Sequence, residues 1–147
     1  MLPGYAFAAR LRVRYAEIDG QKIVFNSRYL EYVDVAVTDW WEWTGIEAAL
    51  GDAWRALEFN VRRAEIDYLK PFRLGDRIDA HVRIERIGGT SLTKRFALAH
   101  ADTGEVHCEV TLVSVCVDLA VGRRVPIGGP VRTFLEGVLA GQPEWVA

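Results

Sequence analysis

Alternating apolar and polar positions near the N-terminus predict a β-strand over residues 6–15. One face of this segment is apolar and the other carries three arginines. The apolar positions are Phe7, Ala9, Leu11, Val13 and Tyr15. A period of two is typical of a strand with one buried face. The loop EIDGQKIVFN follows at residues 17–26.

Apolar residues then recur at helical spacing from about Arg28 to Thr44. The positions at this spacing are Leu30, Val33, Val37, Trp40 and Trp41. Asn26 or Ser27 is expected to cap the start of this helix, and Gly45 is expected to end it. Most of the circumference is apolar, which predicts a helix buried against several neighbours.

The rest of the chain reads mainly as strands joined by tight turns. The predicted strands are 57–68, 78–87, 92–99 and 106–118, and a short helix is predicted over 131–139. The apolar parity changes at Arg62-Arg63, which predicts a β-bulge there. Short connections predict an antiparallel sheet, so the fold class is α+β. We expect residues 1–147 to form a single domain.

Composition narrows the class of protein. Half of the 147 residues are apolar and the net charge is −2, which argues against a nucleic-acid-binding protein. No apolar run has the length of a membrane span, and the N-terminus lacks the features of a signal peptide. A cytoplasmic protein without membrane partners is therefore expected. Cys108 and Cys116 lie too far apart on one predicted strand to form a disulfide.

Several kinds of catalytic site are missing from the sequence. It has no GxSxG, CxxC or HExxH motif and no glycine-rich phosphate loop of the required form. His81 is predicted on the polar face of its strand, while His100 and His107 flank a hairpin. Their spacing does not suit a metal site, so surface or structural roles are expected for all three.

The loop before the helix offers candidate chemistry. Free N–H groups at a helix start favour negative charge, and Asp19 lies a few residues upstream of that start. Such a carboxylate can attack an acyl carbonyl or activate water while the helix end holds the oxyanion. Alternatively, Asp19-Gly20 serves only as a turn.

Four segments resemble the 4-hydroxybenzoyl-CoA thioesterase family of the hotdog superfamily. They are RVRYAEIDGQKIVFNSRYLEYVDVA, YLKPFRLGDRI, VRIERIGGTSLT and VCVDLAVGRRVPI, and together they cover nearly the whole chain. The resemblance implies a hotdog fold, in which a five-stranded antiparallel sheet wraps around a long central helix. It also implies homodimers, often assembled into homotetramers, with active sites at subunit interfaces.

The same resemblance assigns roles to three residues. Asp19 falls where the family has its catalytic aspartate, and Asn26 falls where a backbone N–H polarises the thioester carbonyl. Tyr15 matches a tyrosine near the active site of related thioesterases. Many relatives have histidine in place of Asn26, and asparagine cannot serve as a general acid or base. A mechanism that needs this imidazole is excluded, whereas one using Asp19 and a backbone oxyanion hole is compatible with asparagine at this position. Gln21-Lys22 also replaces smaller residues common in this loop.

Other polar and aromatic residues are secondary candidates. Glu17, Glu31 and Asp34 could supply a second catalytic group or could form salt bridges and caps. Arg86, Lys94 and Arg95 border the Gly88-Gly89 hairpin, where they could hold CoA phosphates or form a solvated basic edge. Trp40, Trp41 and Trp43 could line an acyl pocket or pack in the core.

The predicted function is hydrolysis of an acyl-CoA to a free acid and CoA, with no metal or redox cofactor. One alternative is a noncatalytic acyl-CoA-binding or scaffolding hotdog protein. Another is a hotdog dehydratase or hydratase, which the absence of histidine from this loop and helix disfavours. The sequence does not identify the acyl group.

Overall fold

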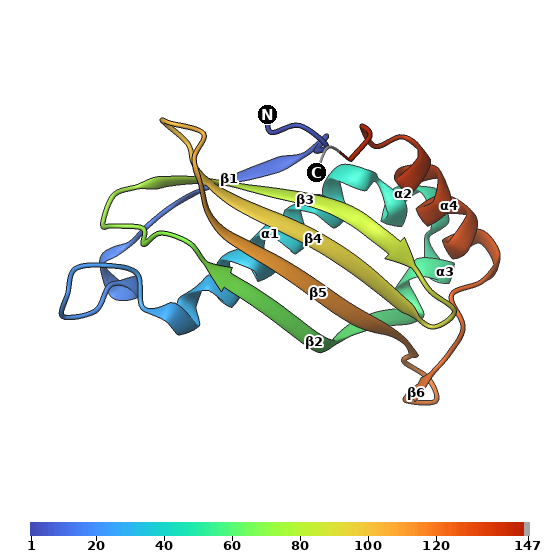
Figure 1. Cartoon of the computed structure of the whole chain (residues 1–147). Coiled ribbons are helices and arrows are strands. Elements are labelled where there is room, and N and C mark those ends of the chain that lie inside the picture. Colours follow the sequence, from blue (N-terminus) through green and yellow to red (C-terminus); the bar gives the residue numbers. More distant parts are fainter. Residues whose placement is uncertain (146–147) are drawn as a thin grey trace.

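The sheet curls around one long helix, α1, in the computed structural model, which describes residues 1–145 (Figure 1). The strands are β1 (Ala8–Arg12), β2 (Leu57–Tyr68), β3 (Arg77–Ile87), β4 (Ser91–His100), β5 (Val106–Asp118) and β6 (Arg123–Arg124). The helices are α1 (Tyr29–Thr44), α2 (Ile46–Leu50), α3 (Asp52–Arg55) and α4 (Gly129–Ala140). This arrangement confirms the predicted α+β class.

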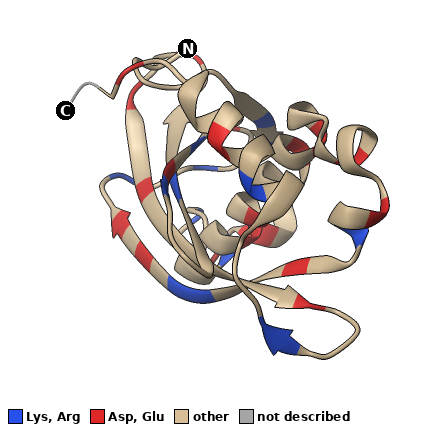
Figure 2. Cartoon of the chain, turned by 90° about the vertical axis from the view of Figure 1, so that its right-hand side faces the viewer, with Lys and Arg blue, Asp and Glu red and all other residues tan. Residues whose placement is uncertain are grey.

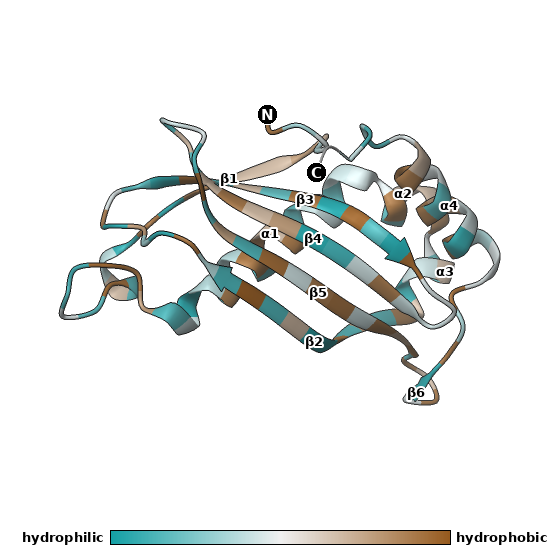
Figure 3. Ribbon diagram, viewed as in Figure 1, coloured by the Kyte–Doolittle hydropathy of each residue, from teal (hydrophilic) through white to brown (hydrophobic). Residues whose placement is uncertain are grey.

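Every strand pairing in the sheet is antiparallel. The order is β1-β3-β4-β5-β2, with β6 beside β5, so β1 and β2 are the edge strands. Figure 3 shows apolar and polar residues alternating along β2 to β5, as expected when one face of each strand is buried. The predicted first strand is too long, because β1 ends at Arg12 and Tyr15 begins a 3₁₀ turn. Tyr15 is therefore 79% exposed rather than inward-facing.

Helix α1 forms the centre of the core. Its buried side chains are Tyr29, Tyr32, Val33, Ala36 and Trp40. Gly45 ends the helix as predicted, with a φ of 73° that a residue lacking Cβ adopts freely. Leu30 and Val35 are 41% and 43% exposed in this single chain, so the prediction of burial on most sides is wrong at these two positions.

The start of α1 differs from the prediction in its capping. A 3₁₀ turn, Asn26–Arg28, precedes the helix directly, so the helical segment is continuous from Asn26 to Thr44. Within the described chain, no side-chain hydrogen bond caps either start, and neither Asn26 nor Ser27 plays the predicted capping role. Backbone N–H groups at this end are thus left to other acceptors.

The bulge in β2 is where the sequence predicts it. The pairing of β2 with β5 shifts register between Val61 and Arg63, so Arg62 is the extra residue. On β5, Cys108 and Cys116 are buried and free, as predicted. Burial raises the pKa of the Cys108 thiol to about 12, which keeps it protonated and unreactive.

Two short helices were not predicted. Helices α2 and α3 occupy residues 46–55, and they lie with α4 at one end of the sheet (Figure 1). Each is one to two turns long, too short for helical periodicity to show in the sequence. Helix α4 confirms the helix predicted over 131–139. No helix in the described chain has the length and apolar character needed to cross a membrane. Acidic and basic residues are intermixed in Figure 2, in line with the small net charge.

Candidate active site

The loop between β1 and α1 is held in place at several points. The N–H of Val13 donates to the Asp76 carbonyl at 2.9 Å, which fixes the start of the loop. Ile18 forms an antiparallel bridge with Val24, and Ile23 forms another with Arg73. The loop is therefore a narrow hairpin whose base lies against the rest of the fold, at the end of the molecule where α1 begins (Figure 1).

Glu17 is the buried anchor of this loop. Its carboxylate accepts hydrogen bonds from the Arg14 N–H at 2.8 Å, the Arg14 guanidinium at 2.8 and 3.0 Å, and the Tyr32 hydroxyl at 2.9 Å. Burial acts to raise the pKa of Glu17, but these hydrogen bonds outweigh it and hold the pKa below its ordinary value. Glu17 thus has the salt-bridge and capping role that was one of the two alternatives for it.

Asp19 lies near the tip of the hairpin. Its N–H donates to the Ile23 carbonyl at 2.9 Å, and its carboxylate accepts from the Gln21 N–H at 2.7 Å. This second bond forms an Asx turn and fixes the side chain. Lys22 closes the turn with a φ of 64°, an uncommon conformation for a residue with a side chain.

A cavity of about 670 Å³ adjoins Asp19. It is lined by Tyr15, Ile18, Asp19, Gly20, Lys22 and Leu74. The structure therefore brings together two of the predicted site residues, Tyr15 and Asp19. Asn26 is not among the residues that line this cavity. Within one chain, the Asp19 carboxylate and the start of the helical segment thus lie on one loop but do not line a single pocket.

The start of the helical segment offers free hydrogen-bond donors. The backbone N–H groups of Asn26 and Ser27 donate to no acceptor in the described part of the chain. The Tyr68 hydroxyl donates to the Asn26 carbonyl at 2.9 Å and so joins β2 to this turn. The sequence analysis missed Tyr68. Its signal was its place at the end of β2, but pairing with Asn26 is visible only in three dimensions.

The carboxylates of Glu31 and Asp34, both on α1, have surroundings different from those of Asp19. Glu31 accepts hydrogen bonds from the Arg28 guanidinium at 2.9 and 3.2 Å, which is the predicted salt-bridge alternative. Asp34 lines a second, larger cavity between α1 and the sheet, of about 1200 Å³. The same cavity is lined by Trp41, whereas Trp40 is buried in the core. Trp43 is exposed, with its ring 5.3 Å from that of Phe7.

The three proposed CoA-binding cations do not form one cluster. Arg86 is exposed, and Arg95 lies 3.8 Å from Glu85 with its guanidinium over the ring of Trp145. Lys94 points to the opposite face of β4, toward α1, and is 1% exposed. Successive residues of a strand face opposite sides of a sheet, so Lys94 and Arg95 cannot share a surface. The sequence carried this signal, because Lys94 is in phase with the apolar residues Leu92, Phe96 and Leu98.

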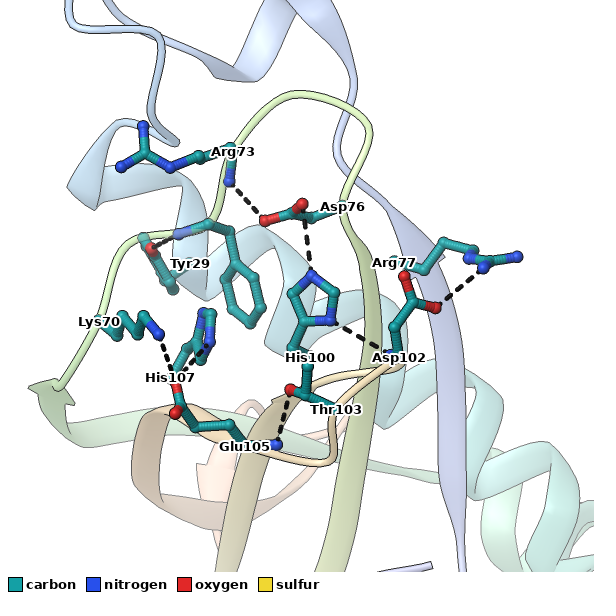
Figure 4. Close-up of polar contacts among 11 residues, drawn as sticks. Tyr29, Lys70, Arg73, Asp76, Arg77, His100, Asp102, Thr103, Glu105 and His107 are labelled. Atoms are coloured by element: carbon teal, nitrogen blue, oxygen red, sulfur yellow. Dashed lines mark hydrogen bonds and ion pairs between the residues drawn. The ribbon is translucent and has the colours of Figure 1, made fainter.

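The histidines are more buried than the sequence predicted. His81 was expected on a polar face, but the N-terminal segment covers it, and the Leu2 N–H lies 3.3 Å from its Nε2. Figure 4 shows His100 and His107 in a separate polar cluster. His100 pairs with Asp76 at 3.4 Å, and His107 with Glu105 at 3.2 Å. These contacts give the histidines structural roles at the ends of β3, β4 and β5.

Residues 13–135 match the family described as the Thioesterase-like superfamily. The chain belongs to this superfamily, and it has the predicted enzyme class of a thioester hydrolase. Long-chain acyl-CoA thioesterase FadM of Escherichia coli (strain K12) is 25% identical over 130 residues, 86% of this chain and 95% of that protein. Acyl-CoA thioester hydrolase YbgC of Escherichia coli O6:H1 is 27% identical over 108 residues, 74% and 79% of the two chains.

Solved structures confirm the fold. A hypothetical protein from Thermus thermophilus superposes with a TM-score of 0.79 at 24% identity, covering 89% of this chain and 98% of that one. The probable thioesterase YbaW from Escherichia coli superposes with a TM-score of 0.74 at 24% identity, covering 90% and 98%. At this identity the likeness concerns the fold alone, and the fold is the predicted hotdog fold.

Proposed function

We propose that this protein hydrolyses an acyl-CoA thioester and that Asp19 is its catalytic carboxylate. The observation that carries the proposal is the placing of Asp19. Its side chain borders a cavity on a rigid hairpin that leads directly into a helix with free N–H groups. The relatives FadM and YbgC, which are named as acyl-CoA thioesterases, support the choice of substrate class.

The proposed chemistry needs only a carboxylate, hydrogen-bond donors and water. Asp19 removes a proton from water as the water oxygen attacks the thioester carbonyl, and the Asn26 N–H stabilises the resulting oxyanion. When the C–S bond breaks, the CoA sulfur leaves and takes the proton back from Asp19. In the nucleophilic version, the Asp19 carboxylate attacks the carbonyl, the C–S bond breaks and CoA leaves as the thiolate. Water then hydrolyses the mixed anhydride, which gives the free acid, regenerates the Asp19 carboxylate and supplies the proton that the thiolate takes up. Tyr15 borders the same cavity and can contact the substrate.

A homo-oligomer with active sites between subunits is part of the proposal. Strand β2 is an edge strand with an exposed apolar residue, Val61, which lines the same cavity as the exposed Leu30 of α1. Free strand edges and apolar patches of this kind favour association of copies. A second copy over β2 would bury them, and light scattering at micromolar concentration should give at least a dimer mass. A monomer mass would contradict the shared site.

Arg86 and Arg95 are the remaining candidates for holding CoA phosphates. Arg86 is exposed and the Arg95 side chain is partly exposed, although its Nε is buried, and arginine pairs well with phosphate oxygens. Lys94 does not suit this role, because a phosphate would have to enter the space beneath α1 to reach it. Single Arg86→Met and Arg95→Met variants should raise KM for acyl-CoA while leaving kcat almost unchanged.

The mechanism is tested by comparing two variants. Asp19→Asn keeps the shape of the side chain but removes its charge, and kcat should fall by roughly 10²–10⁴. Asn26→Ala should do less harm, since the proposed donor is the main chain. CoA release can be followed by the appearance of free thiol. Full activity in Asp19→Asn together with a folded but inactive Asn26→Ala would assign the chemistry to the Asn26 side chain instead. Tight acyl-CoA binding without any CoA release by the wild type would favour the noncatalytic alternative.

A further inference from the structure

The inner face of the sheet carries two polar side chains where apolar ones are expected. On β4, the inward residues Leu92, Phe96 and Leu98 are fully buried, and Lys94 occupies the same face between them. On β5, Ser114 is an inward residue paired with Leu92. Polar groups rarely occupy such positions unless they have partners. Both residues therefore call for a physical explanation.

Lys94 and Ser114 line the larger cavity, which lies between α1 and the sheet and measures about 1200 Å³. The cavity extends along α1 from Leu30 in the first turn to Trp41 in the last, a length of roughly 16 Å at 1.5 Å per residue. Its walls are largely apolar. They include Val33, Val37, Phe59 and Leu112. A space with this shape and lining suits a long apolar chain that begins near the start of α1.

The Lys94 ammonium group has no anionic partner in the described part of the chain. Its Nζ lies 5.3 Å from the centroid of the Trp41 ring, and it takes part in no ion pair. Burial is the physical cause that lowers the pKa of Lys94 to about 8. The amine is therefore still protonated at neutral pH. A buried unpaired cation is costly, and a ligand that supplies an anion offsets that cost.

The other charges around the cavity leave Lys94 as the cation available to a ligand. Arg55 also lines the cavity, but it is already bonded to Glu47 at 3.0 Å and to Asp52 at 3.0 Å. The acidic lining residues Asp34, Glu42, Glu47 and Glu58 are all exposed to solvent. Their charges are screened at the rim, and they disfavour an anion there. An anionic group is favoured only at the buried end, beside Lys94.

We propose that Lys94 binds a carboxylate at the far end of the acyl chain, so that the substrates are CoA thioesters of long-chain dicarboxylic acids. This inference rests on the proposed acyl-CoA hydrolysis. The apolar walls hold the methylene chain, and the Lys94 ammonium pairs with the terminal carboxylate. Ser114 lines the same cavity and lies two residues along β5 from Leu112, the residue paired with Lys94. Lys94 is thus a specificity-determining residue and takes no part in bond breaking.

The test compares two substrates of equal chain length, dodecanoyl-CoA and its ω-carboxy counterpart. Wild-type enzyme should prefer the ω-carboxy substrate by roughly 100-fold in kcat/KM, because a plain chain leaves the buried ammonium unpaired. Lys94→Met should reverse this preference by losing activity on the ω-carboxy substrate and gaining it on dodecanoyl-CoA. Lys94→Gln removes the charge but keeps a polar group, and it should also lose the preference. Lys70→Met is the matched control, because Lys70 is an exposed lysine paired with Glu105 outside the cavity.

The outcomes separate this inference from the proposed function. Equal kcat/KM for both substrates, unchanged in Lys94→Met, would overturn the role of Lys94 while leaving thioester hydrolysis intact. A preference for an ω-hydroxy chain over the ω-carboxy chain would show that a neutral hydrogen bond, not charge, is recognised, and would also overturn it. If the folded wild type hydrolyses no CoA thioester, the proposed function fails. Calorimetry with dodecanedioate and dodecanoate then decides the binding role, since only wild-type protein should prefer the diacid.

Discussion

Replacing Lys94 by methionine should make the protein more stable at neutral pH. The side chains have similar lengths, so methionine can fill the same space on β4 without the charge. The pKa of Lys94 is lowered to about 8, against about 10.4 in an unfolded chain, and this gap corresponds to about 3 kcal/mol. Loss of the contact between the ammonium and Trp41 offsets about 1 kcal/mol of that gain. The expected net gain at pH 7 is about 2 kcal/mol.

The pH dependence of this gain follows from proton linkage. Between pH 8 and about 10.4, the unfolded chain keeps a proton that folded Lys94 has lost, so the wild type becomes more stable as pH rises. Below pH 8 both states are protonated, and the full cost of burying the charge is present. The advantage of Lys94→Met should therefore be largest at pH 7 and should disappear as the pH rises to about 10.4.

Urea unfolding of both proteins at pH 7 and pH 10.4 measures these differences. Thermal unfolding at pH 7 should show a Tm higher by about 5 °C in Lys94→Met. The control is Lys70→Met, whose exposed ion pair with Glu105 should change stability by less than about 1 kcal/mol. A Lys94→Met protein that is less stable at pH 7, or equally stabilised at both pH values, would refute the reasoning.

Three further predictions concern the loop between β1 and α1. Glu17→Ala should lower the free energy of unfolding by about 2 kcal/mol, because the Arg14 and Tyr32 donors lose a buried acceptor. Urea unfolding measures this loss, with Glu17→Gln as the control. The folded pKa of Glu17 lies below the unfolded value of about 4.3, so the contribution of its carboxylate to stability is complete above that pH and is lost as the pH falls. Equal loss of stability in acid by wild type and Glu17→Gln would contradict this pH dependence. Lys22→Gly should gain about 0.5–1 kcal/mol in urea unfolding, since glycine adopts positive φ without a steric penalty, and Lys22→Ala should gain nothing.

The sequence predicted most of the fold because its strands and its long helix obey simple periodicities. The alternation along β3, β4 and β5 marks one buried face, and the change of parity at Arg62 marks the bulge in β2. Gly45 marks the end of α1 because its left-handed conformation suits glycine. Helices α2 and α3 escaped prediction because elements of four or five residues contain little more than one helical turn, too few to show a repeating pattern.

The candidate site was less accessible from the sequence. The loop pattern pointed to Asp19, and the structure places it beside Tyr15 at a cavity. The bond from the Tyr68 hydroxyl to the Asn26 carbonyl joins residues 42 positions apart, and no local pattern encodes it. Glu17 could be read only as a carboxylate near the site, because its burial depends on Tyr32 packing over the loop.

Lys94 shows how a local pattern and a residue type can point in opposite directions. Its charge and its place near the Gly88-Gly89 hairpin suggested a phosphate ligand at the surface, whereas its phase with Leu92 and Phe96 indicated the core. The alternation of apolar residues decides where Lys94 lies. Shifting the register of β4 by one residue would turn its whole buried face outward, which would cost far more than burying one amine. A charge buried in the core at a cost of about 3 kcal/mol destabilises the fold unless a bound ligand offsets that cost. The stability of Lys94→Met and its substrate preference therefore test one argument from two independent directions.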